Sequence, residues 1–172
     1  MDICKVFKND GFMKFDEKNL QLLDELQKDC RQSLKKIARK LNMSITTVYD
    51  RMKRLEKEGV IKGYKAILDP EKANNPITAF IFAKVEYFSP DVEEPLSQRE
   101  IAKRISLLPG VSEVFIVPGD WDILIKIRGK TVKDVADFVI DKLRKMRGVG
   151  RTFTTDVWIT VKESTELNLA KQ

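Results

Sequence analysis

Three short stretches near the start of the chain carry apolar residues at every third or fourth position, which is the spacing of a helix with one buried face. The three sets are Leu20, Leu23 and Leu26, then Leu34, Ile37, Ala38 and Leu41, then Val48, Met52 and Leu55. Asp16 is expected to begin the first helix, and Ser33 and Ser44 are expected to cap the other two. Asn42, between the last two helices, suits the left-handed turn that ends a helix. This arrangement predicts a helix-turn-helix.

The residues after the third helix predict a wing and a domain boundary. Gly59 is expected to end the helix, and residues 60–68 are expected to form a strand or one arm of a hairpin. Residues 69–76 are rich in Asp, Asn and Pro, which favours a linker. The expected organisation is a tail at 1–15, a winged helix-turn-helix domain at 16–68, a linker at 69–76 and a second domain at 77–172.

The second domain has its own pattern of strands and helices. Strands are expected at 77–88, 111–117, 121–128 and 148–161, with helices at 97–108 and 132–146 and a tight turn at 118–120. The order βαββαβ predicts an α+β fold, the ferredoxin-like sandwich, in which two helices cover one face of a four-stranded sheet. Apolar residues on both sides of the first strand imply that the other face needs a partner. We therefore expect a homodimer that forms through the sheets.

The expected helix at 132–146 has an apolar side and a charged side. The apolar side consists of Val132, Val135, Ala136, Val139, Ile140, Leu143 and Met146. On the charged side, Asp137 and Asp141 follow Lys133 and precede Lys145 at steps of four residues. Opposite charges at this spacing pair along a helix surface, so the pattern by itself predicts a solvated helix face.

The formal net charge of +6 is concentrated in the first third of the chain. Residues 1–65 contain sixteen Lys or Arg and ten Asp or Glu, whereas residues 66–172 contain sixteen of each. Residues 28–57 alone carry ten Lys or Arg against three acids. Such an asymmetry on two adjacent helices favours a polyanion as their partner, and double-stranded DNA is the partner that we expect.

A helix that binds DNA presents its N-terminal turns to base edges in the major groove. The residues expected there are Ser44, Thr46, Thr47, Tyr49, Asp50 and Arg51. The residues expected to contact phosphates are Lys53, Arg54, Lys36 and Lys62. An ordinary pair of surface helices with a charged face would give a similar pattern, so the stretch at 33–55 alone leaves both interpretations open.

Other features of the composition argue against several classes of protein. The two cysteines, Cys4 and Cys30, are far apart and His is absent, so a zinc site, a disulfide framework and a histidine base are unsupported. Gly129-Lys130-Thr131 resembles the end of a phosphate-binding loop, but Leu124 stands where that loop needs an earlier glycine. No apolar run is long enough for a membrane span, and the N-terminus lacks a signal-peptide core. We expect a cytoplasmic protein without catalysis, metal or cofactor.

Short motifs occur along the chain in a fixed order. They are Leu22-Leu23, Lys28 to Arg31, Ile37-Ala38, Ser44 to Val48, Arg51, Leu55-Glu56 and Gly59 to Tyr64, followed by Pro109-Gly110-Val111, Gly119 to Asp122, Gly148-Val149, Thr152 and Thr154. In this order they resemble the Lrp/AsnC, or feast/famine, family of transcription regulators. The resemblance implies dimers, commonly assembled into octamers, that bind DNA and hold an amino acid or similar small molecule in clefts between dimers. The chain departs from the family in the tail at 1–15 before its first helix, at Asn19, where an acid is usual, and in a longer link at 88–98.

The resemblance also implies an effector site. Gly119, Asp120 and Asp122 belong to a turn whose backbone would hold the two charged ends of an amino acid, and Thr152 and Thr154 belong to the final strand of the same site. Asp137 and Asp141 match positions at which family members that recognise basic amino acids place acids. The implied effector is lysine, arginine or glutamine. Two alternatives stay open, because the turn could be an ordinary hairpin and the acids could belong only to the charged helix face.

The expected function is that of a sequence-specific DNA-binding transcription regulator whose assembly or DNA affinity responds to a small effector. The main alternative is an architectural DNA-binding protein without an effector, which would bind most sequences alike and with a steep salt dependence. RNA binding by the sheet is a third possibility. We expect the uncovered face to consist of Ile, Ala and Val without paired aromatic residues that stack bases, which argues against RNA.

Overall fold

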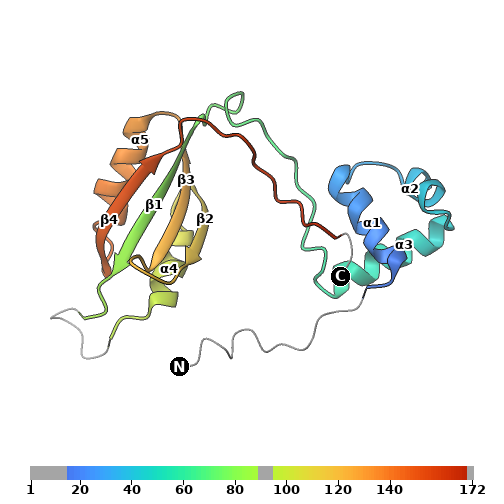
Figure 1. Cartoon of the computed structure of the whole chain (residues 1–172), viewed down its shortest axis with the longest axis horizontal. Helices are drawn as coiled ribbons and strands as arrows, with labels where there is room; N and C mark the ends of the chain where they lie inside the picture. The colour runs from blue at the N-terminus through green and yellow to red at the C-terminus, as the bar shows by residue number, and fades with distance from the viewer. Residues whose placement is uncertain (1–14, 89–94, 170–172) are drawn as a thin grey trace. The chain divides into compact units, whose positions relative to one another are not determined.

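The computed structural model describes residues 15–88 and 95–169 of the chain. The chain divides into two compact units (Figure 1). The first unit runs to Ala66 and also takes in the residues from Ser164 onwards, and the second spans Ile67–Glu163. Of the expected tail at 1–15, only Phe15 lies among the described residues, and it packs against the core of the first unit. Residues 89–94 of the long link also lie outside them.

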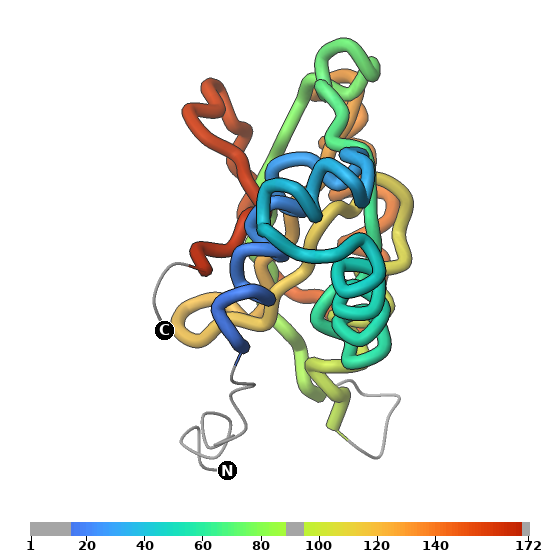
Figure 2. Tube along the Cα trace, turned by 90° about the vertical axis from the view of Figure 1, so that its right-hand side faces the viewer, coloured from blue at the N-terminus to red at the C-terminus, as the bar shows by residue number. Residues whose placement is uncertain are grey.

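The first unit contains the three expected helices (blue to teal in Figure 2). They are α1 at Glu17–Lys28, α2 at Leu34–Leu41 and α3 at Ile45–Lys57. The side chains of Asp16, Ser33 and Ser44 each accept a hydrogen bond from a backbone N–H in the first turn that follows, as a capping residue does. Asn42 has the left-handed conformation, with a φ of 50°. The cap positions and the turn predicted from the sequence are therefore confirmed.

The residues after α3 do not form the expected strand. The backbone N–H groups of Val60 and Ile61 both donate to the carbonyl of Leu55, at 2.9 and 3.1 Å, and close the end of the helix. From there to residue 68 the chain has no regular secondary structure and pairs with no strand in the described part of the protein. The prediction of a strand at 60–68 is wrong for this structure, because a strand needs a hydrogen-bonded neighbour and none lies beside it. Ile67, for example, is left 86% exposed.

The C-terminal segment is an unexpected part of the first unit. The backbone N–H of Leu167 donates to Oε1 of Gln27 at 2.7 Å, and Nε2 of Gln27 donates to the carbonyl of Leu167 at 3.0 Å. Leu169 packs against the helical core. The side chain of Gln27 in α1 thus binds both the backbone N–H and the backbone carbonyl of Leu167. The first unit therefore combines the N-terminal helices with a segment from the C-terminal part of the chain.

The second unit has the expected ferredoxin-like order βαββαβ. Its elements are β1 at Ile77–Val85, α4 at Gln98–Ser106, β2 at Val111–Ile116, β3 at Ile123–Gly129, α5 at Val132–Asp137 with η2 at Phe138–Leu143, and β4 at Val149–Asp156. The strands lie in the order β2-β3-β1-β4, and every neighbouring pair is antiparallel. The helices α4 and α5 cover one face of the sheet and share one core with it (Figure 1).

The two faces of this sheet carry different residues. Ala79, Ile81 and Ile125 are fully buried beneath the helices. Phe82 points to the other face, where the register places it between Leu124 and Phe153. The expected open face of Ile, Ala and Val is therefore wrong, because strand alternation puts those residues under the helices and aromatic residues on the open side.

The expected helix at 132–146 is shorter and differently wound. After α5 the chain makes one π-helical turn, η2, in which the backbone N–H of Arg144 donates to the carbonyl of Val139, five residues back. The wider turn rotates the side chains that follow it. Phe138 is buried, whereas Ile140 within the turn, expected on the buried side, is 56% exposed. Val132, which lies at the start of α5 before the π-helical turn and is likewise expected on the buried side, is 55% exposed.

Strand β4 is also shorter than expected. Its start is set by Gly148, which has a φ of 86° and where a Cβ would lie only 2.5 Å from Cδ1 of Ile101. The expected strand reached residue 161, but β4 ends at Asp156, and the backbone N–H of Val157 makes the last hydrogen bond, to the carbonyl of Thr78. Beyond this point Trp158 is 94% exposed.

Candidate DNA interface and effector region

The N-terminal half of α3 presents a row of exposed polar and aromatic side chains. Thr46, Thr47, Tyr49 and Asp50 are all exposed. Ser44 caps the helix: its Oγ accepts from the backbone N–H of Thr47 at 3.0 Å and lies 2.7 Å from Oγ1 of the same residue. In a helix-turn-helix the second helix enters the major groove by its N-terminal turns. The predicted residues of this row are therefore placed together on a surface that suits base edges.

Ile45 is a member of this surface that the sequence pattern did not reveal. It is 48% exposed, and it lies four residues before Tyr49, which is 49% exposed, on the same side of the helix. An apolar side chain in the groove can pack against the methyl group of thymine. Periodicity could not identify Ile45, because an isoleucine at the start of a helix looks like a core residue.

A set of cations near α3 is free of internal partners. Lys36 and Lys62, both predicted to meet phosphates, are exposed, as are Lys35 and Arg39 on α2. Within the described residues, none of these four side chains makes an ion pair or a hydrogen bond. Unpaired charges of one sign on one surface attract a polyanion more strongly than charges that are already compensated.

Lys53 and Arg54 are exposed but paired with acids of the same helix. Nζ of Lys53 donates to Oε2 of Glu56 at 2.9 Å, and the hydroxyl of Tyr64 donates to Oε1 of the same carboxylate at 3.1 Å. The hydrogen bond to Glu56 raises the pKa of Lys53, and burial together with the bond to Glu56 raises the pKa of Tyr64 to about 12. Nε of Arg54 lies 3.9 Å from Oε1 of Glu58. Exposed pairs of this kind are weak, so a phosphate can compete for both cations.

Arg51 is not at the surface where the sequence predicted it. Its Nη1 donates to Oδ2 of Asp16 at 2.6 Å and to Oδ1 of Asn19 at 2.7 Å, and its side chain is 24% exposed. The guanidinium is thereby turned toward α1 and away from the row that begins at Thr46. Both of these hydrogen bonds come from Nη1, so part of the guanidinium is used within the first unit, which disfavours a base contact; the role of Arg51 toward DNA stays a prediction.

One residue of the predicted effector turn, Asp122, makes hydrogen bonds within the second unit. Gly119 has a φ of 108°, and both it and Asp120 are exposed. The carboxylate of Asp122 accepts from the backbone N–H of Val85 at 2.8 Å, and its backbone carbonyl accepts from Nε2 of Gln98 at 2.9 Å. Asp122 therefore fastens the turn to the end of β1, which leaves Gly119 and Asp120 as the turn residues open to a ligand.

Asp137 and Asp141 form the charged helix face expected from their spacing. Nζ of Lys133 lies 2.5 Å from Oδ2 of Asp137, and Nζ of Lys145 lies 2.8 Å from Oδ1 of Asp141. The hydrogen bond to Lys145 lowers the pKa of Asp141. Each acid thus has a lysine partner one helical turn away.

A hollow of about 300 Å³ lies between α5–η2 and β4. Its walls are apolar and its polar groups come from three residues, Arg144, Thr154 and Asp156. Oγ1 of Thr152 accepts a hydrogen bond from Nε of Arg144 at 2.9 Å, which holds this cation in place. The structure therefore brings the two predicted threonines together with Arg144 and Asp156, neither of which the sequence pattern indicated.

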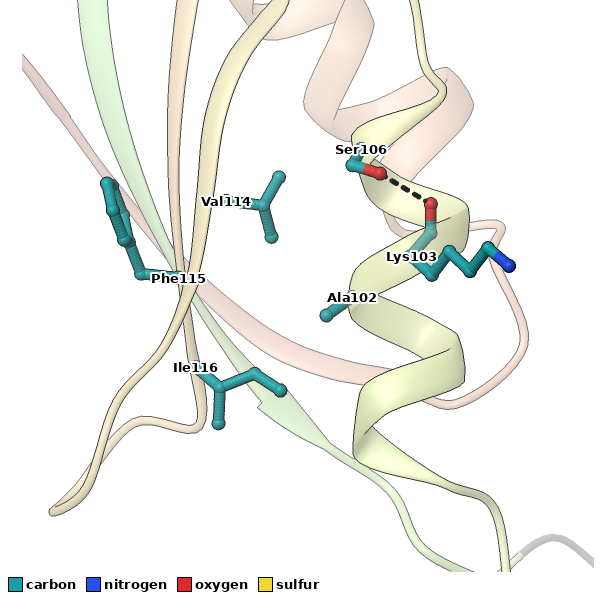
Figure 3. A pocket seen from close by; sticks show the side chains of 6 residues that line it. All are labelled: Ala102, Lys103, Ser106, Val114, Phe115 and Ile116. Atoms are coloured by element: carbon teal, nitrogen blue, oxygen red, sulfur yellow. Dashed lines mark hydrogen bonds between the residues drawn. The ribbon is translucent and has the colours of Figure 1, made fainter. Parts of the chain in front are cut away.

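A second hollow, of about 440 Å³, lies between α4 and β2 (Figure 3). Ala102 and Val114 point into it from opposite sides, while the side chain of Lys103 extends away from the strand. The hydroxyl of Ser106 donates to the carbonyl of Lys103 at 2.7 Å, within the helix. Because few polar groups converge here, this hollow lacks the chemistry of a specific ligand site.

The open face of the sheet carries a cluster of aromatic rings. The ring centroids of Phe82, Trp121 and Phe153 lie 6.0 to 6.2 Å from one another. The guanidinium of Arg151 lies 4.8 Å from the centroid of Trp121. These aromatic residues remove the sequence-based argument against RNA, which assumed that the face had none.

Except for Arg151, which has no acid partner among the described residues, the cations on the same face are paired with acids. Nη2 of Arg128 donates to Oε2 of Glu163 at 2.6 Å, and Lys126 pairs with both Glu163 and Glu113. The rings also pack on one another and beneath Arg151, so they are not separate platforms for bases. With so little free positive charge to hold a phosphate backbone, the face suits a protein surface better than RNA.

Two classes of site have no counterpart in the described residues. No group of three or more Cys, Asp or Glu is placed to hold a metal ion there. None of the helices in residues 15–88 and 95–169 is both long and apolar enough to cross a bilayer.

Two family models match the chain. A winged helix-turn-helix DNA-binding model matches residues 15–62, and a model of the Lrp/AsnC ligand-binding domain matches residues 78–167. An HTH-type transcriptional regulator of Pyrococcus horikoshii is 40% identical over 148 residues, which cover 86% of this chain and 95% of that protein. The HTH-type transcriptional regulator FL11 of the same species is 32% identical over 152 residues, with 88% and 95% covered.

Solved structures of similar proteins have the same fold. A transcriptional regulator from Neisseria meningitidis, solved as a complex with L-Met, superimposes with a TM-score of 0.82 and 25% identity over 91% of this chain and 98% of that one. LrpC of B. subtilis superimposes with a TM-score of 0.71 and 26% identity over 87% and 99% of the two chains.

Proposed function

Since this chain belongs to the Lrp/AsnC family of DNA-binding transcription regulators, we propose that a free amino acid binds its second unit and modulates its DNA affinity or assembly. The first unit supplies DNA binding, which the matched winged helix-turn-helix model describes. The row of Thr46, Thr47 and Tyr49 on α3 is proposed to meet base edges, with Lys36 and Lys62 on phosphates.

The hollow beside β4 is the observation that supports an amino-acid effector. Arg144 offers a cation and Asp156 a carboxylate, with the hydroxyl of Thr154 in the same lining. A free amino acid carries a carboxylate and an ammonium group, which complement these two charges. Thr152 already orients Arg144, so little ordering is needed when a ligand arrives. The volume of about 300 Å³ lies at the lower end of the range for small-molecule sites.

The side chain of the effector is the second part of the proposal. Asp137 and Asp141 lie on the helix that forms one wall, and their exposed pairs with lysines are weak enough for a ligand cation to replace. Lysine, arginine and glutamine are therefore the first candidates. Methionine, the ligand of the solved Neisseria relative, is the apolar comparison, because Val132 and Ile140 would suit its side chain. Gly119 and Asp120 do not line the hollow, so any contact from them requires a neighbouring copy.

We further propose a homodimer through the open face of the sheet. The cluster of Phe82, Trp121 and Phe153 is an apolar surface beside Lys126 and Arg128, which are already paired with Glu163, and aromatic residues with few free charges are typical of the centre of a protein interface. A dimer with twofold symmetry would present α3 twice and so favour a DNA site with two half-sites. A higher assembly such as an octamer could then form from dimers.

The test is calorimetry of the full-length protein with lysine, arginine, glutamine and methionine. Wild-type protein should bind at least one of them, and Arg144→Ala should weaken that binding by about tenfold or more, because it removes a charge-assisted hydrogen bond. Lys142→Ala is the matched control: it removes an exposed cation of η2 that does not line the hollow and, within the described residues, pairs with neither Asp137 nor Asp141.

DNA binding provides the second measurement, on a duplex enriched from a random pool by the wild-type protein. A gated regulator should change its affinity for this duplex, or its mass in solution, when the effector is added. The architectural alternative predicts equal affinity for enriched and random duplexes, a steep salt dependence and no response to any amino acid. That combination of results would refute the effector proposal.

A further inference from the structure

Helices α1 and α3 are joined by a small network of hydrogen bonds centred on Arg51. Asp16 takes part through both carboxylate oxygens: Oδ1 accepts from the backbone N–H of Asn19 at 2.7 Å, and Oδ2 accepts from Arg51 at 2.6 Å. The same nitrogen of Arg51 donates to Oδ1 of Asn19 at 2.7 Å. The residue that caps α1 and a residue in the first turn of α1 therefore both hold one guanidinium.

The Asn19 side of the network is protected from water, whereas the side chain of Asp16 is 51% exposed. Asn19 is 4% exposed, and among the described residues it and Thr78 are the buried polar ones. The side chain of Arg51 is 24% exposed, compared with 57% for Lys53 and 54% for Arg54 on the same helix. A buried amide oxygen without a donor is costly, so Asn19 requires Arg51 in this position.

The position of α3 depends on this network because its other contacts in the unit have little direction. Val48 and Leu55 of α3 are buried in the apolar core with Leu22 of α1, and apolar contacts allow small rotations and slides. Hydrogen bonds are directional. Among the described residues, the two bonds of Arg51 are the only side-chain hydrogen bonds between α1 and α3.

We propose that Arg51 is a positioning residue, which sets the orientation of α3 toward DNA through Asp16 and Asn19 and makes no contact with DNA itself. A small rotation of α3 would move the whole row from Ile45 to Tyr49 relative to base edges. The network would therefore affect DNA recognition although it lies on the side of α3 that faces α1. The inference rests on the DNA-binding role of the family and is independent of the proposed effector.

A double-mutant cycle in the full-length chain tests the proposal. One variant is Arg51→Ala. The other is Asp16→Ser/Asn19→Leu, which keeps a capping hydroxyl on α1 but removes both acceptors of Arg51. Each should lower the affinity for the enriched duplex by about tenfold, and combining them should cause no further loss, because both remove the same network. Arg51→Lys should restore part of the affinity, since an ammonium group can reach one acceptor.

The controls separate positioning from direct contact and from a general loss of stability. Circular dichroism should show all variants folded at the binding temperature. Lys53→Ala should weaken binding to enriched and random duplexes alike and lower the salt slope by about 0.9, because one phosphate would no longer be neutralised. If Asp16→Ser/Asn19→Leu binds as tightly as wild type while Arg51→Ala does not, Arg51 contacts DNA directly. If both variants lose thermal stability but keep full affinity, the network is only structural. Either result overturns the proposal.

Discussion

The surface of α2 and the open face of the sheet use positive charge in opposite ways. On α2, Lys35, Lys36 and Arg39 are exposed and have no partner among the described residues. On the sheet, Lys126 and Arg128 are both held by Glu163. The first surface keeps its charge available for a polyanion, whereas the second cancels its charge beside aromatic rings. Net charge alone would not distinguish a surface that suits DNA from one that suits another protein. The two surfaces differ in whether each cation is paired with an acid.

Lys126 shows how complete this compensation is. Burial by itself would lower the pKa of Lys126, but the hydrogen bonds to Glu163 and Glu113 outweigh burial and raise it. The ammonium group, whose side chain is 12% exposed, therefore stays charged and tied to its acids. At Lys126 and Arg128, a second protein surface that covers this face would therefore meet ion pairs rather than unpaired charges.

The largest effect is expected from a charge placed among the rings. Phe153→Asp should convert the proposed dimer into a monomer, because an unpaired carboxylate in an apolar interface costs several kcal/mol. Twofold symmetry would introduce the change twice in each interface. Sedimentation velocity of the purified protein at micromolar concentration would measure the result.

Leu107→Asp is the matched control for this experiment. Leu107 is an exposed apolar residue, 77% accessible, at the end of α4, which covers the opposite face of the sheet. It should leave the dimer intact. Dissociation by both variants, or by neither, would show that the open face is not the interface.

A smaller effect is expected from the free cations of α2. Lys36→Ala/Arg39→Ala should weaken binding to all DNA, and the slope of log affinity against log salt should fall by about 0.9 for each phosphate that is no longer neutralised. Lys133→Ala/Lys145→Ala removes two cations that are paired with acids of their own helix and should leave the slope unchanged. Equal changes of slope in the two double variants would mean that pairing does not distinguish the two kinds of cation.

The first unit could be predicted in detail where its structure is decided by near neighbours. Ser33 and Ser44 cap helices through residues three positions away, and Asn42 ends a helix through its own conformation. The order of elements in the second unit could be predicted for the same reason, since each strand and helix has its own period. Local rules of this kind need no knowledge of what the segment packs against.

The remainder depends on contacts between distant residues. Arg51 has the helical spacing of a DNA-reading residue, and only the approach of α1, 35 residues earlier, turns it inward. Gln27 and Leu167 are 140 residues apart. Alternation along β1 shows that its two faces differ, but the helices decide which face is covered. The π-helical turn at η2 has no signal in the periodicity, and Ile140 within this turn lies at the surface beside the hollow.

The smallest effect is expected at Glu56, where a cation and a phenol share one carboxylate. Burial and the hydrogen bond to Glu56 raise the pKa of Tyr64 from 10.0 to about 12, so the folded protein keeps a proton that the unfolded chain has already released. The stability that Tyr64 contributes is therefore fully present below pH 10 and is lost as the pH rises through about 12. Urea unfolding across this range should show a shallower loss of stability in Tyr64→Phe than in wild type. Lysines titrate in the same range in both proteins, so the difference between the two curves isolates the phenol; parallel curves would mean that the bond to Glu56 contributes no stability.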